Sequence, residues 1–196
     1  MPKVSQEHLE RRRQQILDAA ASCFSRQGFH ATSMRDIFAA AGLSAGAVYR
    51  YYPSKTDLIR AIAAEALAIA LPALDSAITD RATPSIPDVV AALVTQLRDG
   101  RLAPLRPVVL QVWAEAVRDQ ELAELARSTL AQLRAHLTPW LERLAAEGQI
   151  PSRTDTTAAG GLITALLQGY VIQLTVLGDV SPQKVREAAA ALFSDC

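Results

Sequence analysis

Aromatic residues and cysteines are scarce in this chain, and their scarcity narrows the classes of protein it can represent. Phe, Trp and Tyr make up 5% of the 196 residues, and runs of alternating β-branched residues are absent. Half of the residues are nonetheless hydrophobic, with long stretches rich in Ala and Leu that favour helices. The composition predicts an all-α protein of one large domain or two small ones.

The few cysteines and the N-terminal residues bear on the cellular compartment. Cys23 and Cys196 cannot form a disulfide framework, and Cys23 is expected to be a small core residue. The N-terminal segment has no apolar stretch after its basic residues, so we predict no signal peptide and a reducing, cytoplasmic setting. His8, His30 and His136 are too scattered to predict a metal site, and no cofactor is expected.

Charge is unevenly distributed, although the formal net charge is zero. The first 60 residues hold nine Lys and Arg against five Asp and Glu, a net charge of +4, and the remainder carries −4. A basic head on an acidic body can attract phosphates at one end of the molecule. Arg11, Arg12 and Arg13 form either an arm near a DNA backbone, the interpretation we favour, or a solvated helix start.

Hydrophobic spacing and helix-stop signals divide the chain into about nine helices. Gly28 is expected to end the first helix in the left-handed conformation, and Pro72 to kink the fourth or mark its last turn. We predict one domain over residues 1–54 and a larger one over 55–196. The expected helices are 6–26, 34–41, 45–51, one starting after Ser54, 87–100, 103–118, 120–148, 154–178 and 181–194.

Two of the predicted helices are short and are joined by a tight turn. Ser33 and Asp36 match a capping box at the start of the first, and Gly42 allows positive φ in the turn. Ser44 is the expected N-cap of the second, which Pro53 ends. Two short helices joined by a glycine-containing turn predict a helix-turn-helix, the second helix of which reads DNA.

The same segment resembles the N-terminal domain of the TetR family of bacterial repressors. About 60 residues carry the resemblance in continuous register. They include Gly28-Phe29, Thr32-Ser33-Met34-Arg35-Asp36-Ile37, Ala41-Gly42-Leu43-Ser44, Gly46-Ala47-Val48-Tyr49 and Tyr51-Tyr52-Pro53-Ser54-Lys55. The larger C-terminal part is similar in size and helicity.

The resemblance implies a set of DNA contacts. It implies phosphate contacts from Thr32, Tyr49 and Tyr51, a cationic anchor at Lys55, and small residues at the tip of the recognition helix. Arg50 is the first candidate for reading guanine. The full implied set is Thr32, Ser33, Arg35, Ser44, Ala45, Gly46, Tyr49, Arg50, Tyr51 and Lys55.

Some residues in this segment depart from the family or have a second interpretation. Ala45 stands where Lys is frequent, and Phe38 where Ala is usual, so operator preference and local packing are expected to differ from relatives. Tyr49 and Tyr51 could instead be core aromatics, although contacts to DNA are favoured for both. For Tyr52 the core interpretation is favoured.

The C-terminal part is expected to bind a ligand and to dimerise. No charged residue lies between Asp155 and Asp179, which is long enough for a membrane span, but polar residues and glycines in it favour a buried helix. A small hydrophobic or aromatic effector is expected at Trp113, Leu137, Trp140, Thr164 and Gln168, although both tryptophans could be ordinary core residues. The expected dimer interface is Leu167, Tyr170, Val171, Leu174, Val185, Ala188, Ala189 and Leu192.

These patterns predict a ligand-responsive regulator, most simply a repressor that binds a palindromic DNA operator as a homodimer. An activator on the same scaffold is one alternative, and a helical carrier or enzyme that has lost DNA binding is another. No enzymatic activity is predicted. Ser181 and Lys184 match an S-x-x-K pattern, but Ser181-Pro182 is better explained as a helix cap followed by a first-turn proline.

Overall fold

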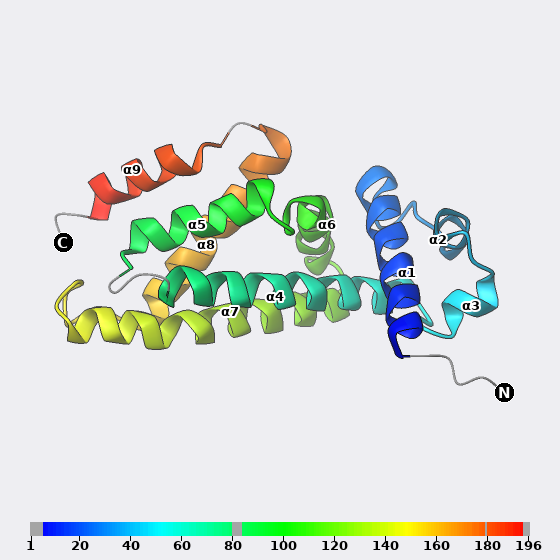
Figure 1. The fold of residues 1–196 in the computed structure, drawn as a ribbon, viewed down its shortest axis with the longest axis horizontal. Helices are drawn as coiled ribbons and strands as arrows, with labels where there is room; N and C mark the ends of the chain where they lie inside the picture. Colours follow the sequence, from blue (N-terminus) through cyan, green and yellow to red (C-terminus); the bar gives the residue numbers. More distant parts are fainter. Residues whose placement is uncertain (1–5, 80–83, 179, 194–196) are drawn as a thin grey trace. The chain divides into compact units, whose positions relative to one another are not determined.

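The computed structural model describes residues 6–79, 84–178 and 180–193, and among them regular structure is helical throughout (Figure 1). The predicted all-α class is therefore confirmed. The predicted break at Asp179 and the end of the last helix at residue 194 lie outside the described residues. The described helices are α1 (Gln6–Gln27), α2 (Met34–Ala41), α3 (Ala45–Tyr49), α4 (Lys55–Thr79), α5 (Ile86–Asp99), the 3-10 helix η1 (Ala103–Leu105), α6 (Arg106–Ala116), α7 (Gln120–Ala146), α8 (Thr156–Val176) and α9 (Pro182–Phe193).

The chain folds into two compact units, and each is built from two segments of sequence. Unit 1 contains the described residues up to Glu65 together with Pro107–Ala123, and unit 2 contains Ala66–Arg106 and the described residues from Glu124 onward. The domain boundary predicted between residues 54 and 55 coincides with the start of α4. The boundary between the two compact units instead lies inside α4, between Glu65 and Ala66.

The core of unit 1 joins α1 to the helix-turn-helix and to the first turns of α4. Ile16, Ala20 and Phe24 recur along one face of α1 and are fully buried. The next three helices contribute further buried apolar residues, and burying each such side chain is worth about 1.5–3 kcal/mol. These residues are Ile37, Val48, Leu58, Ile59 and Ile62.

Helix α6 and the start of α7 are fastened to unit 1 by polar contacts. Gln111 donates its Nε2 hydrogen to the carbonyl oxygen of Phe24 at 2.7 Å, near the end of α1. His30 and Glu115 form a second contact of 2.5 Å between Nε2 and Oε2, and Arg60 lies 3.3 Å from Glu121. Residues 107–123 are far from the helix-turn-helix in sequence, but they belong to the same structural unit.

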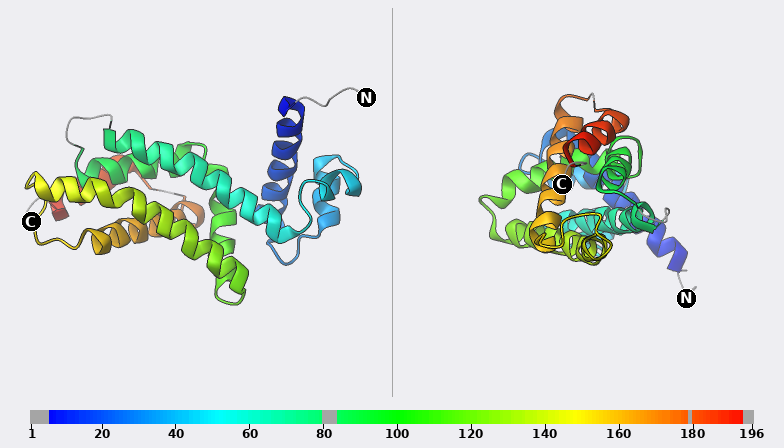
Figure 2. Two further views of the ribbon diagram at one scale, coloured as in Figure 1. Left: turned by 90° about the horizontal axis from the view of Figure 1, so that it is seen from below. Right: turned by 90° about the vertical axis from the view of Figure 1, so that its left-hand side faces the viewer.

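Unit 2 is a helical bundle in which α5 packs against both α8 and α9 (Figures 1 and 2). One apolar cluster runs through all of its long helices. Asp155 caps α8 by accepting hydrogen bonds from the backbone N–H groups of Thr157 and Ala158, both at 3.0 Å. The buried cluster comprises Leu74, Ile78, Val89, Val90, Leu93, Val94, Leu137, Trp140, Leu141, Leu144, Ile163, Leu174, Val180 and Val185.

Two long helices contain a proline yet remain continuous. Pro72 lies inside α4 and Pro139 inside α7, and both side chains are exposed. A proline cannot donate the backbone hydrogen bond of a helix interior, so each costs helix stability that the surrounding packing must offset. The expectation that Pro72 marks the last turn is corrected, because α4 continues to Thr79.

Helices α4 and α8 are both long and apolar enough to cross a membrane on length and composition alone. In α8, Ile163, Val171 and Leu174 are buried in unit 2, whereas Ile172 and Val176 remain 51% and 70% exposed. The expectation that α8 is covered on every side is therefore not met within a single chain. One apolar face of α8 packs in the core of unit 2, and a second apolar face is exposed to solvent.

Candidate nucleic-acid interface and sensor core

Helix α2 begins with the capping box that its sequence predicts. The Ser33 hydroxyl accepts the Asp36 backbone N–H at 3.2 Å, and Asp36 Oδ2 accepts the backbone N–H of Ser33 at 2.8 Å. The Ser33 hydroxyl also donates to Asp36 Oδ2 at 2.6 Å. These bonds from Ser33, first from its hydroxyl and then from its backbone, lower the pKa of Asp36 from its ordinary value of 3.8.

The turn between α2 and α3 is set by one glycine and one long side chain. Gly42 has φ +64°, a left-handed conformation that any larger residue adopts only with strain, as predicted from the sequence. Gln15 of α1 donates to the carbonyl oxygen of Ala41 at 2.7 Å and so holds the end of α2. Leu43 is partly buried in the turn. The turn therefore fixes the direction in which α3 leaves α2.

The tip of α3 is exposed and lacks large side chains. Ser44 is the N-cap, and its Oγ accepts the Ala47 N–H at 3.3 Å. Ala45 and Gly46 follow, both exposed, and a Cβ added to Gly46 would meet nothing of this chain within 4 Å. Residues 42–46 also spell G-x-S-x-G, but a hydrolase nucleophile elbow needs a strand before its helix, and here the segment joins two helices.

Basic and aromatic side chains flank this small-residue tip. Arg35 on α2 and Arg50 at the end of α3 are exposed, and Tyr51 is half-buried. Tyr49 is 47% exposed and lies edge-on to Phe38, with ring centroids 5.1 Å apart. The local packing change predicted from Phe38 thus has a definite form, because Phe38 supports the ring of Tyr49 from α2.

Thr32 is not exposed to solvent, as the phosphate contact implied by the resemblance would require. Its side chain is fully buried, and its hydroxyl donates to the carbonyl oxygen of Gly28 at 2.7 Å. The expectation of a phosphate contact from Thr32 is therefore corrected, because the hydroxyl closes the loop after α1. Ser33, next in sequence, is exposed at the surface of α2.

Lys55 anchors the same loop. Its Nζ donates to the carbonyl oxygens of Phe29 and Thr32, both at 2.8 Å, and lies 3.4 Å from that of His30. It also lies 4.7 Å above the ring of Phe29. Three acceptors match the three hydrogens of an ammonium group. In this structure Lys55 holds the chain's own backbone, and the contact with DNA that the resemblance implies for it stays a prediction.

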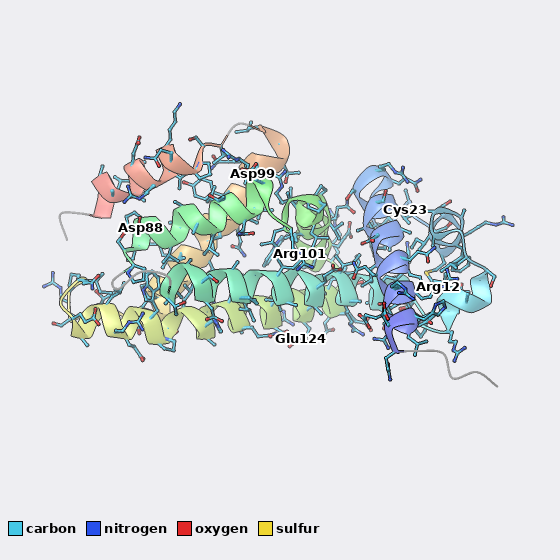
Figure 3. The ribbon with its side chains drawn as sticks, in the orientation of Figure 1. Arg12, Cys23, Asp88, Asp99, Arg101 and Glu124 are labelled. Atoms are coloured by element: carbon cyan, nitrogen blue, oxygen red, sulfur yellow. The ribbon has the colours of Figure 1, made fainter. Side chains whose placement is uncertain are left out.

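The remaining charged and aromatic residues of the head are divided between solvent and core. Arg11 pairs with Glu7 at 2.7 Å, and Arg12, labelled in Figure 3, lies 2.9 Å from the Gln15 side chain. Tyr52 is half-buried, and burial raises the pKa of its hydroxyl. Cys23 is buried in α1, as its small apolar neighbours predicted.

The predicted ligand residues do not all fall in one unit. Leu137, Trp140 and Thr164 are buried in unit 2, and Gln168 is partly buried there on α8. Trp113 lies on α6, in unit 1. The structure therefore groups four of the five residues in unit 2 and leaves Trp113 with the helix-turn-helix.

Most of the predicted dimer residues belong to the core of a single chain. Val171, Leu174, Val185 and Ala189 are buried, so they have little surface left for a partner. Leu167 and Tyr170 pack against the same core from its edge. Val171 and Leu174 therefore have too little exposed surface for the interface expected of them on α8, whereas Leu167 and Tyr170 are only partly buried. Ala188 and Leu192, both on α9, are exposed.

The sequence reasoning missed the open apolar face of α8. Ala158, Leu162, Ala165, Ile172 and Val176 are exposed, and spacings of three, four and seven residues place them along one stripe of the helix. Gly169 falls on the same stripe. The helical spacing was visible in the sequence, but nothing local says which of two apolar stripes faces outward.

A short exposed helix, held by a glycine turn on a second helix and flanked by arginines, defines a helix-turn-helix DNA-binding protein. Residues 16–62 match the family model "Bacterial regulatory proteins, tetR family", and residues 88–196 match "BetI-type transcriptional repressor, C-terminal". The second match alone covers more than half of the chain. The chain belongs to the TetR family of transcriptional regulators.

Individual relatives agree with this assignment. The chain is 34% identical over 139 residues to the HTH-type transcriptional repressor Rv1474c of Mycobacterium tuberculosis, covering 68% of this chain and 71% of that protein. It is 34% identical to the uncharacterized regulator YfiR of Bacillus subtilis, covering 62% of this chain and 61% of the relative. Salmonella enterica GusR has the same fold, with a TM-score of 0.80, 26% identity, and coverage of 98% of this chain and 100% of that one.

Proposed function

We propose that this regulator is a repressor that binds a palindromic operator as a homodimer and leaves it when a small effector binds. The observation that carries the proposal is the exposed small-residue tip of α3 between Arg35 and Arg50. Relatives named as repressors, Rv1474c and LfrR of Mycolicibacterium smegmatis, support repression over activation.

The shape of the α3 tip suits close approach to DNA. A helix that enters the major groove needs its leading end free of bulk, and Ser44, Ala45 and Gly46 provide this. We assign base reading to Arg50, whose planar guanidinium can bond O6 and N7 of one guanine. Tyr49 and Arg35 contact phosphates in this proposal, and these contacts position the helix without selecting a sequence.

The open stripe of α8 suits a two-fold dimer. A monomeric protein seldom leaves a contiguous apolar face in water, so the stripe favours a partner. Pairing with a second copy uses the same stripe twice, as an isologous contact requires. Ala188 and Leu192 of α9 are also exposed, and we keep them as candidates for the interface. Such a dimer would place two recognition helices about 34–36 Å apart, in successive major grooves.

Unit 2 is the part we assign to effector binding. Its buried residues are almost all apolar, with Trp140 and Thr164 supplying polar atoms. Release from DNA requires the effector to bind the DNA-incompetent conformation more tightly than the competent one, because equal binding shifts no equilibrium.

An electrophoretic mobility shift assay with the DNA upstream of the gene that encodes this protein tests the proposal. Tyr49→Ala should weaken binding to operator and to unrelated duplex alike, by roughly tenfold. Arg50→Ala should weaken operator binding with little effect on unrelated duplex, since a bidentate base contact is worth about 1–3 kcal/mol of discrimination. Equal operator binding by the wild type and both variants would refute the contact assignments. Failure of the wild type to retard any duplex at low salt would refute the function.

A further inference from the structure

Phe38 of α2 is a large aromatic residue at the edge of the unit 1 core. Its neighbour Ile37 is fully buried, whereas Phe38 is only partly buried and packs against Tyr49 of α3. The ring centroids are 5.1 Å apart and the ring planes meet at 71°, which is the edge-to-face geometry that aromatic pairs favour. The pair therefore joins the two helices of the helix-turn-helix at the protein surface.

Tyr49 combines a supported ring with an unused hydroxyl. The residue is 47% exposed, and within the described part of the chain its hydroxyl forms no hydrogen bond. A side chain that rotates freely loses conformational entropy when a partner immobilises it. Because the Phe38 ring already restricts the Tyr49 ring, a partner of the hydroxyl meets a side chain that is oriented before it binds.

The turn between α2 and α3 is fixed by contacts that do not involve Phe38. Gly42 adopts the left-handed conformation of the turn, and Gln15 of α1 holds the end of α2 through a hydrogen bond of 2.7 Å. Val48 anchors α3 in the core, where it is fully buried. Removing a partly exposed ring beside these contacts should leave the helix-turn-helix folded. The aromatic pair is better explained by its effect on Tyr49.

We infer that Phe38 is a positioning residue for DNA binding, which orients the Tyr49 side chain so that its hydroxyl contacts a phosphate. This rests on the proposed function, which assigns the phosphate contact to Tyr49. A phosphate contact selects no base, and an uncharged side chain neutralises no phosphate. Phe38 therefore raises the affinity for every duplex and changes neither the sequence preference nor the salt dependence of binding.

A double-mutant cycle on DNA affinity tests this role. Fluorescence anisotropy of the full-length protein compares the wild type, Phe38→Leu, Tyr49→Ala and the double variant on two duplexes of equal length, one taken from the DNA upstream of the gene and one unrelated. We expect Phe38→Leu to weaken binding to both by about three- to tenfold, the strength of one aromatic pair, with an unchanged salt slope. In the Tyr49→Ala background it should have no further effect, to within about twofold.

Phe29→Leu is the matched control, because it disrupts another aromatic pair of unit 1. Phe29 and Phe24 have ring centroids 5.7 Å apart. Any loss of affinity in this variant should be the same with and without Tyr49. Circular dichroism checks that each variant is folded, and Phe38→Met, which also lacks the ring, takes the place of Phe38→Leu if that variant is unfolded.

Several outcomes overturn the inference. These are wild-type affinity of Phe38→Leu for both duplexes, a loss confined to the upstream duplex, a loss that persists in the Tyr49→Ala background, or equal coupling of Phe29→Leu to Tyr49→Ala. A persistent loss would mean that Phe38 contacts DNA itself or holds α3 in place. Wild-type affinity of Tyr49→Ala would refute the phosphate contact and this inference together. Failure of the wild type to bind any duplex at low salt would refute the proposed function instead.

Discussion

At the scale of single residues, Lys55 and Thr32 use their polar groups to stabilise the fold of the helix-turn-helix unit itself. Both close the loop of residues 28–32, one through its hydroxyl and the other through its ammonium group. Those bonds fix where α2 begins relative to α1. The exposed residues of α2 and α3, which we propose to contact DNA, are thereby held in place.

Lys55→Met tests this scaffold role. The variant keeps the apolar stem but removes three donors, so we expect a loss of about 1–3 kcal/mol in the free energy of unfolding. Thermal denaturation should show a midpoint lower by several degrees. Lys184→Met, which removes an exposed lysine of α9, is the control and should leave the midpoint unchanged. The salt dependence of operator affinity should keep its slope, whereas loss of a phosphate contact would reduce that slope by about 0.9.

Asp36 gives the capping box a pH dependence. Its pKa is lower in the folded state, because Ser33 bonds favour the carboxylate. The stabilisation is therefore present above the ordinary value of 3.8 and is lost as the pH falls through the lower folded-state value. Urea denaturation of the wild type and Asp36→Asn should differ at neutral pH and converge in acid. Glu147→Gln, which neutralises an exposed carboxylate of unit 2, is the control. A difference that stays constant into acid, or that the control reproduces, would contradict this account.

At the scale of secondary-structure elements, the important feature of α3 is that its exposed N-terminal end lacks large side chains. Gly46→Ala adds one methyl group where the chain itself offers no contact within 4 Å. We expect a fold that is unchanged or more stable, by at most about 1 kcal/mol, because alanine favours the helix. Operator affinity should nonetheless fall by at least about tenfold, since the methyl group meets the floor of the groove.

Gly161→Ala is the matched control for that substitution. Gly161 lies in α8, and a Cβ there meets only the Arg134 side chain, at 4.0 Å. The control variant should gain helix stability without losing operator affinity. Calorimetry and fluorescence anisotropy measure the two quantities on the same samples. Full operator affinity in Gly46→Ala would show that α3 approaches DNA with another face.

Local signals in the sequence predicted most element boundaries to within about two residues. The helix predicted over 103–118 is wrong as a single element, because the structure divides it into η1 and α6. The caps at Ser33 and Ser44 and the left-handed glycines Gly28 and Gly42 are confirmed, because each depends on residues only a few positions away. The internal bonds of Thr32 and Lys55 were not predictable in this way. They depend on how the loop after α1 folds back, which no periodicity records.

The faces of α8 could not be predicted for a different reason. A helix without a charged residue offers no polarity contrast, so hydrophobic spacing cannot distinguish a core face from an interface face. Val171 and Leu174 therefore fitted a dimer seam as well as they fit a core. Only packing against α5 and the rest of unit 2 shows which stripe is covered. Two of the residues predicted for the dimer interface, Val171 and Leu174, are consequently core residues of a single chain.

At the scale of the whole molecule, charge and apolar surface are separated along the sequence. The first 60 residues carry a net +4, and the open apolar stripe lies a hundred residues later, on α8. We expect a single DNA-binding unit with this charge to make few phosphate contacts. Two heads joined through α8 would double their number, and would limit stable binding to sites that match both. Dimerisation and operator selection are thus one property in this proposal.

Ile172→Glu should prevent dimerisation, and with it operator binding, without unfolding the chain. Ile172 is 51% exposed in the single chain, so glutamate there stays solvated in a monomer but faces apolar surface, and a like charge near the axis, in a two-fold dimer. We expect light scattering to report a monomer with unchanged helical circular dichroism, and operator binding to fall by at least about a hundredfold. Val117→Glu, at an 84% exposed valine in the segment just after α6, should remain dimeric and bind normally. A dimeric Ile172→Glu, confirmed with Leu162→Glu/Ile172→Glu, would mean that another surface joins the subunits and that the α8 stripe covers something else.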